Sequence, residues 1–254
     1  MRRFLVNLQF SGKNYNGFQK NDKHKTIQGE LENALLKLFN QTIEVTGVSR
    51  TDAGVSAYEY YFHFDADTKL PADRVAFKLN RFLPADIQCQ QSVEIPFSFD
   101  ARKNCVSKTY EYLLYKSEHL KPLLNKFSVK VSPSINVENM KEAANHLIGK
   151  HDFSTFMTAS SSKSSHIKTV NFINIFTREN NLVIELNADG FLYNMVRIIV
   201  GTLISAGIGE IPPEKMKSIL ESKNRENAGL TMPPKSLILK KVFYDLDLST
   251  FGIK

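Results

Sequence analysis

Hydrophobic and polar positions follow two different periods along the first hundred residues. Alternation of apolar and polar residues at 2–12 and 57–65 predicts two strands, and the run at 87–95 predicts another. Apolar residues spaced three or four apart predict helices at 25–40, with Thr26 as its cap, and at 71–84. With a β-branched strand at 42–48, the order is β-α-β-β-α-β, which is the ferredoxin-like pattern.

The second half repeats this organisation. It predicts the order strand, helix, hairpin, helix, short helix, strand, with the hairpin turning at Asn180-Asn181. Helices on one face of a mostly antiparallel sheet make an α+β fold, and a boundary near residues 100–108 predicts two domains, 1–104 and 105–254. The predicted strands are 108–116, 166–180, 181–189 and 237–248, and the predicted helices are 137–152, 191–207 and 218–223.

The stretch GVSRTDAGVS, residues 47–56, places a carboxylate between two predicted strands. Asp52 follows Arg50 by two positions in a glycine-bounded turn. Loops at strand ends commonly carry chemistry, but aspartate is also a frequent turn residue, because its side chain bonds nearby backbone N–H groups. The stretch alone leaves both readings open.

An arginine stands in the middle of an apolar helix at 191–207. Apolar residues on nearly all sides predict that this helix is buried. The Arg197 guanidinium cannot lose its proton, so it needs an anion, and Gly201 leaves space one turn away. Arg197 therefore faces a catalytic carboxylate or a phosphate, or it extends to solvent or pairs with a structural acid.

Composition narrows the classes of function. The 254 residues are 42% hydrophobic and 23% charged, with a net charge of +7, which fits a soluble protein that attracts phosphates. Lysine clusters at 20–25, 116–126 and 160–168 are either solvated loops or part of such a surface. No signal peptide or membrane span is predicted, and Cys89 and Cys105 read as reduced thiols of a cytoplasmic protein. The six histidines have no metal spacing, and His151-Asp152 reads as a structural turn above Phe153 and Phe156.

Six blocks in order carry a resemblance to a known family. They are FSGKNYNGFQKNDKHKTIQGELENAL, RTDAGV, FDARKNCVSKTYEYLL, GKHDFSTF, GFLYNMVRIIVGTL and LTMPPKSLILKKVFY, and together they cover the chain from about Phe4 to about Tyr244. In sequence and order they resemble the TruA-type tRNA pseudouridine synthases.

The resemblance implies an isomerase that converts uridine to pseudouridine in the anticodon stem-loop of tRNA, at positions 38 to 40. It also implies two ferredoxin-like domains flanking a basic cleft, a homodimer, tRNA as partner and no cofactor. By the same resemblance Asp52, Tyr110 and Arg197 are the catalytic residues, and Arg50, Lys108 and Lys168 bind the substrate. Arg50 is the arginine expected to engage and flip the target nucleotide.

The sequence departs from the family pattern at a few positions. Ser56 stands where a histidine is usual, a tryptophan is usual near Phe18 although this chain has none, and Ser236 replaces a glycine. Lys108 and Lys168 stand where arginines are common, and lysine cannot reproduce the bidentate fork of a guanidinium. These changes affect the expected RNA contacts and leave Asp52, Tyr110 and Arg197 intact.

The chemistry of pseudouridylation suits the candidate residues. A C–N glycosidic bond breaks and a C–C bond forms from C5, so a carboxylate acts on the sugar much as in a retaining glycosidase. Asp52 either attacks C1′ or abstracts a sugar proton, and an arginine beside it favours its ionised form. Tyr110 offers a ring for stacking on a flipped uracil and a weakly basic phenol, or is simply a core tyrosine. Two alternatives remain: an RNA-binding protein without catalysis, and a glycosidase acting on nucleosides, which needs a second carboxylate.

Overall fold

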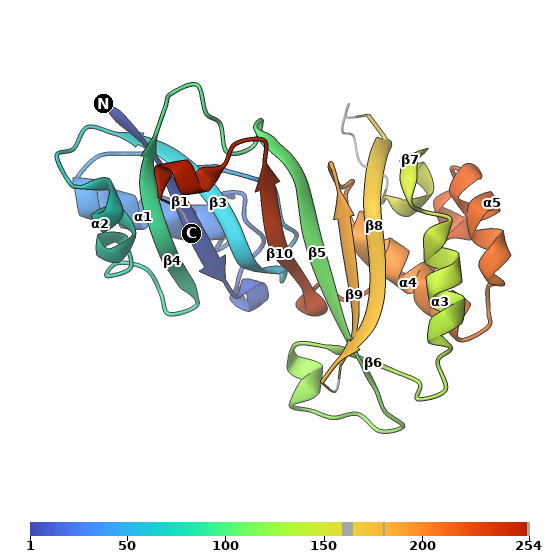
Figure 1. Ribbon diagram of the computed structural model, residues 1–254. Helices are drawn as coiled ribbons and strands as arrows, with labels where there is room; N and C mark the ends of the chain where they lie inside the picture. The colour runs from blue at the N-terminus through green and yellow to red at the C-terminus, as the bar shows by residue number, and fades with distance from the viewer. Residues whose placement is uncertain (159–164, 180, 253–254) are drawn as a thin grey trace. The chain divides into compact units, whose positions relative to one another are not determined.

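The computed structural model describes residues 1–158, 165–179 and 181–252. Within this part the chain forms two compact units, one of residues 1–106 and 238–254 and one of residues 107–237. Each unit combines antiparallel strands with helices, which confirms the predicted α+β class (Figure 1). The division into folding domains 1–104 and 105–254 stays a prediction. By its contacts, the last segment, from Ile238, belongs to the first unit.

The first unit has the ferredoxin-like strand order. Its strands lie in the order β4-β1-β3, and β2 also pairs with β3, all antiparallel. The C-terminal strand β10 joins this sheet parallel to β3, with Ile238 opposite Ser56 and Leu239 opposite Ala57. The elements are β1 Arg2–Phe10, α1 Ile27–Phe39, β2 Thr46–Gly47, β3 Ser56–Ala66, α2 Ala72–Leu79, β4 Ile87–Ile95 and β10 Leu237–Tyr244.

Apolar faces explain why these elements pack. Helices α1 and α2 contact each other, and α2 contacts β4. The largest fully buried side chains of this unit include several aromatic rings, and Phe4 stacks on Phe64 across the β1–β3 pair. Thr26 caps α1 as predicted, because its side chain accepts a hydrogen bond from the Gly29 N–H.

The second unit is built on strands in the order β5-β9-β8-β7. These neighbours are antiparallel, while the short β6 runs parallel to the end of β5. Helices α3 and α4 pack together, and α3 also contacts β8 (Figure 1). The elements are β5 Cys105–Lys116, β6 Val129–Val131, α3 Val137–Asn145, β7 Gly149–Asp152, β8 Ile167–Arg178, β9 Asn181–Ala188, α4 Met195–Gly207 and α5 Met216–Glu221.

Several predicted boundaries are wrong. The helix predicted at 137–152 ends at Asn145, because Gly149 has φ +111° and residues 149–152 pair with β8 instead. The helix predicted at 71–84 ends at Leu79, and the strand predicted at 42–48 is only Thr46–Gly47. Strands β8 and β9 do pair as predicted, although the turn residue Asn180 lies outside the described residues, as does most of the 159–165 loop.

Candidate active site

Asp52 lies in the loop between β2 and β3 of the first unit. Its side chain is half-buried, whereas Arg50 is exposed. The backbone turns sharply here, since the Val55 N–H donates to the Asp52 carbonyl over 3.2 Å and Gly54 has φ +83°. The loop therefore presents Asp52 at a strand end, as the sequence predicts.

The backbone of residues 12–18 packs directly on this loop. The Phe18 N–H donates to the Thr51 carbonyl over 3.3 Å, and the Gly54 N–H donates to the Tyr15 carbonyl over 3.2 Å. A Cβ on Gly17, which has φ +82°, would lie 2.4 Å from the Thr51 carbonyl oxygen. Only glycine allows two backbones to approach so closely in this conformation, so Gly17 helps to fix the position of Asp52.

Aromatic side chains support the same loop from the core. The Tyr60 hydroxyl donates to the Ser49 carbonyl, and its ring stacks on Phe18 with 4.5 Å between centroids. Phe18 itself is fully buried. Ser56, at the end of the loop, accepts a hydrogen bond from the Gly12 N–H over 3.1 Å.

Tyr110 lies on β5 of the second unit, opposite Leu186 of β9. The residue is buried, and its ring meets Phe191 edge-on with 5.0 Å between centroids. An edge-to-face contact of this kind holds the ring in one orientation. Phe191 lies six residues before Arg197 in the chain, so one short segment both contacts Tyr110 and contains Arg197.

The two predicted substrate-binding lysines belong to the same unit. Lys108 lies opposite Ala188 at the start of β5, and Lys168 lies opposite His151 at the start of β8. A Cβ on Gly190 would lie 3.5 Å from the Lys168 side chain, so the chain after β9 passes close to this lysine. Both lysines are half-buried.

Arg197 is held by hydrogen bonds to neutral groups as well as by helix packing. Its Nε donates to the Met232 carbonyl over 2.6 Å, and its Nη1 donates to Asn194 Oδ1 over 2.5 Å. Asn194 has φ +62° and precedes the first turn of α4, so the helix begins at Met195 and not at Phe191. The Asn194 amide also donates to Thr158 Oγ1, which leaves its Oδ1 directed at the guanidinium.

The segment over Arg197 is anchored at two further points. A Cβ on Gly201 would lie 1.9 Å from the Leu230 carbonyl oxygen, so glycine is required where residues 229–232 cross α4. The Tyr112 hydroxyl donates to the Pro233 carbonyl over 2.7 Å. Burial raises the pKa of Tyr112, so this phenol stays protonated and remains a donor at neutral pH.

The structure thus groups the predicted site residues into two sets. Arg50 and Asp52 share one loop of the first unit, and the segment 189–197 of the second unit contacts Tyr110 and Lys168 and contains Arg197. The sequence analysis missed Gly17 and Asn194. An asparagine directly before an apolar helix was the available signal, because asparagine tolerates the left-handed conformation better than most residues.

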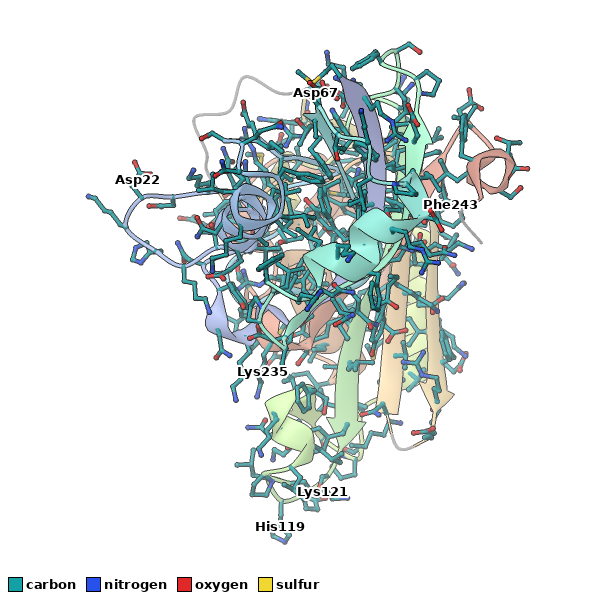
Figure 2. The ribbon with its side chains drawn as sticks, turned by 90° about the vertical axis from the view of Figure 1, so that its left-hand side faces the viewer. Asp22, Asp67, His119, Lys121, Lys235 and Phe243 are labelled. Carbon is teal, nitrogen blue, oxygen red and sulfur yellow. The ribbon has the colours of Figure 1, made fainter. Side chains whose placement is uncertain are left out.

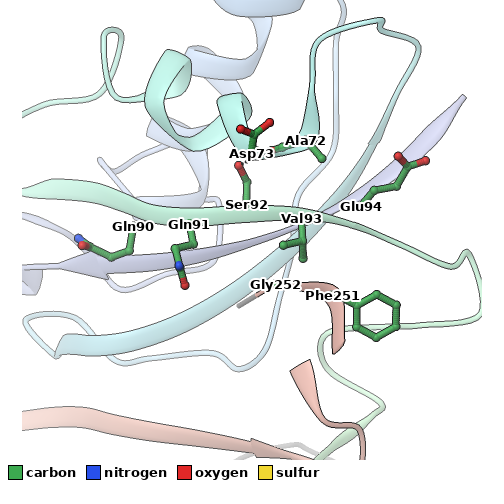
Figure 3. Close-up of a pocket in the computed structure, with 9 residues that line it drawn as sticks. All are labelled: Ala72, Asp73, Gln90, Gln91, Ser92, Val93, Glu94, Phe251 and Gly252. Carbon is green, nitrogen blue, oxygen red and sulfur yellow. Dashed lines mark hydrogen bonds between the residues drawn. The ribbon is translucent and has the colours of Figure 1, made fainter. Parts of the chain in front are cut away.

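The described residues form no cluster of metal ligands and no membrane-spanning helix, and a pocket of the first unit does not include Asp52. Among residues 1–158, 165–179 and 181–252, no group of three or more His, Cys, Asp or Glu side chains is arranged to hold a metal ion. No helix in these same ranges has the length and apolar character to cross a membrane. A shallow pocket in the first unit lies along β4, between Asp73 of α2 and Phe251 near the C-terminus, and does not include Asp52 (Figure 3).

Comparison with known proteins identifies the family. The family model described as tRNA pseudouridine synthase matches residues 8–102 and 143–245. The chain is 40% identical over 244 residues to the tRNA pseudouridine synthase A of Thermoanaerobacter sp. (strain X514), covering 96% of this chain and 100% of that protein. It is 39% identical over 245 residues to the enzyme of the same name from Bacillus subtilis (strain 168), covering 96% and 99%.

A solved Cbf5-Nop10-Gar1 complex matches with 10% identity and a TM-score of 0.37, covering 97% of this chain and 60% of that one, which is too low to support any conclusion. The sequence matches are different in kind, since they span nearly the whole length of both proteins. They confirm the predicted resemblance: this chain is an isomerase of the tRNA pseudouridine synthase family.

Proposed function

We propose that this chain isomerises uridine to pseudouridine in the anticodon stem-loop of tRNA, at positions 38 to 40. The observation that carries the proposal is the match to tRNA pseudouridine synthases over 96% of the chain, with the RTDAGV stretch on a fixed strand-end loop. The net charge of +7 agrees with a polyanionic substrate.

In this proposal Asp52 is the carboxylate that acts on the sugar of the target nucleotide. Cleavage of the C1′–N1 bond leaves positive charge on the sugar, which a carboxylate either traps covalently at C1′ or relieves by taking a sugar proton. Uracil then turns and C5 bonds to C1′, while the covalent bond to Asp52 breaks or, on the other route, Asp52 returns the sugar proton. The C5 proton leaves, and N1 gains a proton. The rigid backbone around Asp52 supports the first step, because catalytic groups must be held close to the reacting atom.

Tyr110 and Arg197 have complementary roles in the proposal. The Tyr110 ring, which packs against Phe191, stacks on the flipped uracil, and its phenol assists removal of the proton at C5. Arg50, Lys108 and Lys168 bind phosphates or the flipped nucleotide. The pairing of Arg197 with Asp52 remains a prediction, which a double-mutant cycle tests: if the two act together, the effects of Asp52→Asn and Arg197→Met on the rate will not add.

Tritium release tests the proposal directly. A tRNA with tritium at C5 of its uridines should release label without any added cofactor, and Asp52→Ala should abolish the release. Asp22→Ala is the matched control, since Asp22 lies on the exposed tip of the 20–25 loop (Figure 2) and should release label at the wild-type rate.

Mapping pseudouridine in the product then tests the position. Modification should appear at positions 38 to 40 and disappear when those uridines are replaced by cytidines. Undiminished release by Asp52→Ala, or pseudouridine only elsewhere in tRNA, would contradict the proposal. Tight binding of tRNA with no release by the wild-type protein would instead favour the RNA-binding alternative.

A further inference from the structure

The segment between β5 and β6 forms a basic projection of the second unit. We call residues 116–130 the β5–β6 lobe; its tip carries His119 and Lys121 (Figure 2). The lobe contains four lysines, all exposed, against the single acidic residue Glu118. The lysines are Lys116, Lys121, Lys126 and Lys130.

The lysines of the lobe differ from those of the 20–25 loop in whether they form ion pairs with acidic side chains. In the 20–25 loop, Lys20 pairs with Glu32 over 2.8 Å and Lys25 with Glu30 over 3.8 Å, so helix α1 neutralises much of that charge. None of the four lobe lysines forms an ion pair within the described ranges. Their charge therefore remains available to an external anion.

The lobe is also ordered by its own hydrogen bonds. The Asn125 N–H donates to the Lys121 carbonyl over 2.8 Å, and the Ser128 hydroxyl donates to the Leu124 carbonyl over 2.7 Å. Lys235 Nζ donates to the Asn125 carbonyl, which ties the lobe to the segment before β10. A preformed basic surface loses little conformational entropy when it binds a partner.

Large apolar side chains lie among these charges. Leu123 is 77% exposed and Phe127 is 59% exposed. An exposed aromatic ring between lysines is typical of surfaces that bind nucleic acid, where the ring stacks on a base and the lysines contact phosphates. A second copy of this chain is a poorer partner, because two net-positive lobes repel each other.

We infer that the β5–β6 lobe binds phosphates of the tRNA outside the loop that contains the target uridine. Strand β5 separates the lobe from Tyr110: Lys116 is six residues further along, or roughly 20 Å at the usual rise of a strand. A nucleotide stacked on Tyr110 is therefore too far away to account for the lobe's charge. The lobe also lies outside the two stretches matched by the family model, which end at 102 and resume at 143.

The inference rests on the proposed function. A pair of double variants tests the role of the lobe in tRNA binding independently of the catalytic proposal. Lys121→Gln with Lys126→Gln removes two lobe charges, while Lys37→Gln with Lys217→Gln removes two exposed charges elsewhere and keeps the same net charge. The measurements are the Kd of full-length tRNA at several salt concentrations and kcat and KM for tritium release.

The lobe variant should bind tRNA about tenfold more weakly, and the slope of log K against log salt should fall by roughly one for each phosphate that the variant no longer neutralises. Its KM should rise while kcat stays unchanged, and the control variant should match the wild type. Equal affinities and slopes for the two variants would overturn the inference, even if the wild-type protein forms pseudouridine normally.

Self-association is the other outcome to examine. The molar mass in solution without tRNA, measured by light scattering, should be the same for the wild type and for Leu123→Ser. If Leu123→Ser dissociates an oligomer and leaves the salt slope for tRNA unchanged, the lobe is an interface between copies of the chain, and the inference is wrong. Failure of the wild-type protein to release tritium from any tRNA would refute the proposed function instead.

Discussion

The loop that carries Asp52 and the segment that carries Arg197 are held in place by different kinds of contact. Around Asp52 the main chain of residues 12–18 lies against the main chain of the loop, with glycines at the closest points. At Arg197 a long side chain is oriented by the Asn194 amide and the Met232 carbonyl. The first arrangement therefore depends more on close main-chain contacts, whereas the second also depends on the identity of one neighbouring side chain, Asn194.

This difference determines which substitutions disturb each place. A methyl group at a glycine contact moves the whole Asp52 loop, whereas removal of one amide leaves the fold around Arg197 intact and takes away only one acceptor of the guanidinium. We expect backbone changes to have the larger effect on the reaction, because they displace a group that acts on the substrate.

Gly17→Ala should have the largest effect. Its Cβ would lie 2.4 Å from the Thr51 carbonyl oxygen at φ +82°, so the loop must shift, and a displacement of about 1 Å costs on the order of a hundredfold in rate. The rate of tritium release from tRNA measures this loss. Gly209→Ala is the control, because Gly209 has φ +83° but no atom within 4 Å of its Cβ, so it should lose about 1 kcal/mol of stability and no activity. Equal rates for the two variants would show that the backbone contact does not position Asp52.

Asn194→Gly should lower the rate less than Gly17→Ala. It tests the orientation of the Arg197 guanidinium with little change in the stability of the protein. Glycine accepts φ +62° readily, so the relief of backbone strain offsets the missing hydrogen bonds, and the free energy of unfolding should change by less than about 1 kcal/mol. The Arg197 guanidinium loses one of its acceptors, and we expect a rate about tenfold lower.

The control for this change is Asn40→Gly, at an exposed helix end with φ +53°. It relieves the same strain without touching the site, so its rate should equal that of the wild type. A normal rate for Asn194→Gly would mean that the Met232 carbonyl and the helix are sufficient to orient Arg197.

The same contrast explains what the sequence could and could not predict. Local sequence signals were sufficient where a single element determines the structure, as for the cap at Thr26. The same holds for the apolar helix α4, whose residues from Met195 to Val200 are buried apart from the half-buried Arg197. The start of α4 was misplaced, because a left-handed asparagine gives only a weak signal in an apolar run. The close approach of Gly17 to Thr51 joins segments more than thirty residues apart, which no local pattern encodes.

Strand alternation was misleading for a related reason. Alternation in β3 predicts one covered face, yet Tyr61 and His63 are buried as well as Tyr60 and Phe62. Tyr244 packs on Tyr61 with 5.5 Å between ring centroids, and the backbone of Ala101 covers His63. Glu111 on β5 is likewise buried, with its charge balanced by two hydrogen bonds from Arg178. The segments that cover these second faces are remote in sequence.

The smallest expected effect concerns His63, whose side chain helps to hold the segment next to the Asp52 loop. Its Nδ1 accepts a hydrogen bond from the Ala101 N–H over 3.1 Å, and the following residue, Arg102, donates to the Gly47 carbonyl just before the Asp52 loop. Burial lowers the pKa of His63, and the charges of Arg3 and Arg102 lower it further, against the opposing effect of Asp100 and Asp65. The folded protein therefore favours the neutral imidazole, which accepts this bond.

The sign of the pH dependence follows from that shift. The unfolded chain binds the proton near pH 6.5 and the folded chain only at lower pH, so the stability present above about pH 6.5 is lost as the pH falls towards the folded pKa. In His63→Asn, the amide oxygen accepts the same bond at every pH, so the free energy of unfolding should fall less between pH 7 and pH 5 than in the wild type. Urea unfolding at several pH values gives the two curves. If they run parallel, His63 does not link protonation to the segment beside the Asp52 loop.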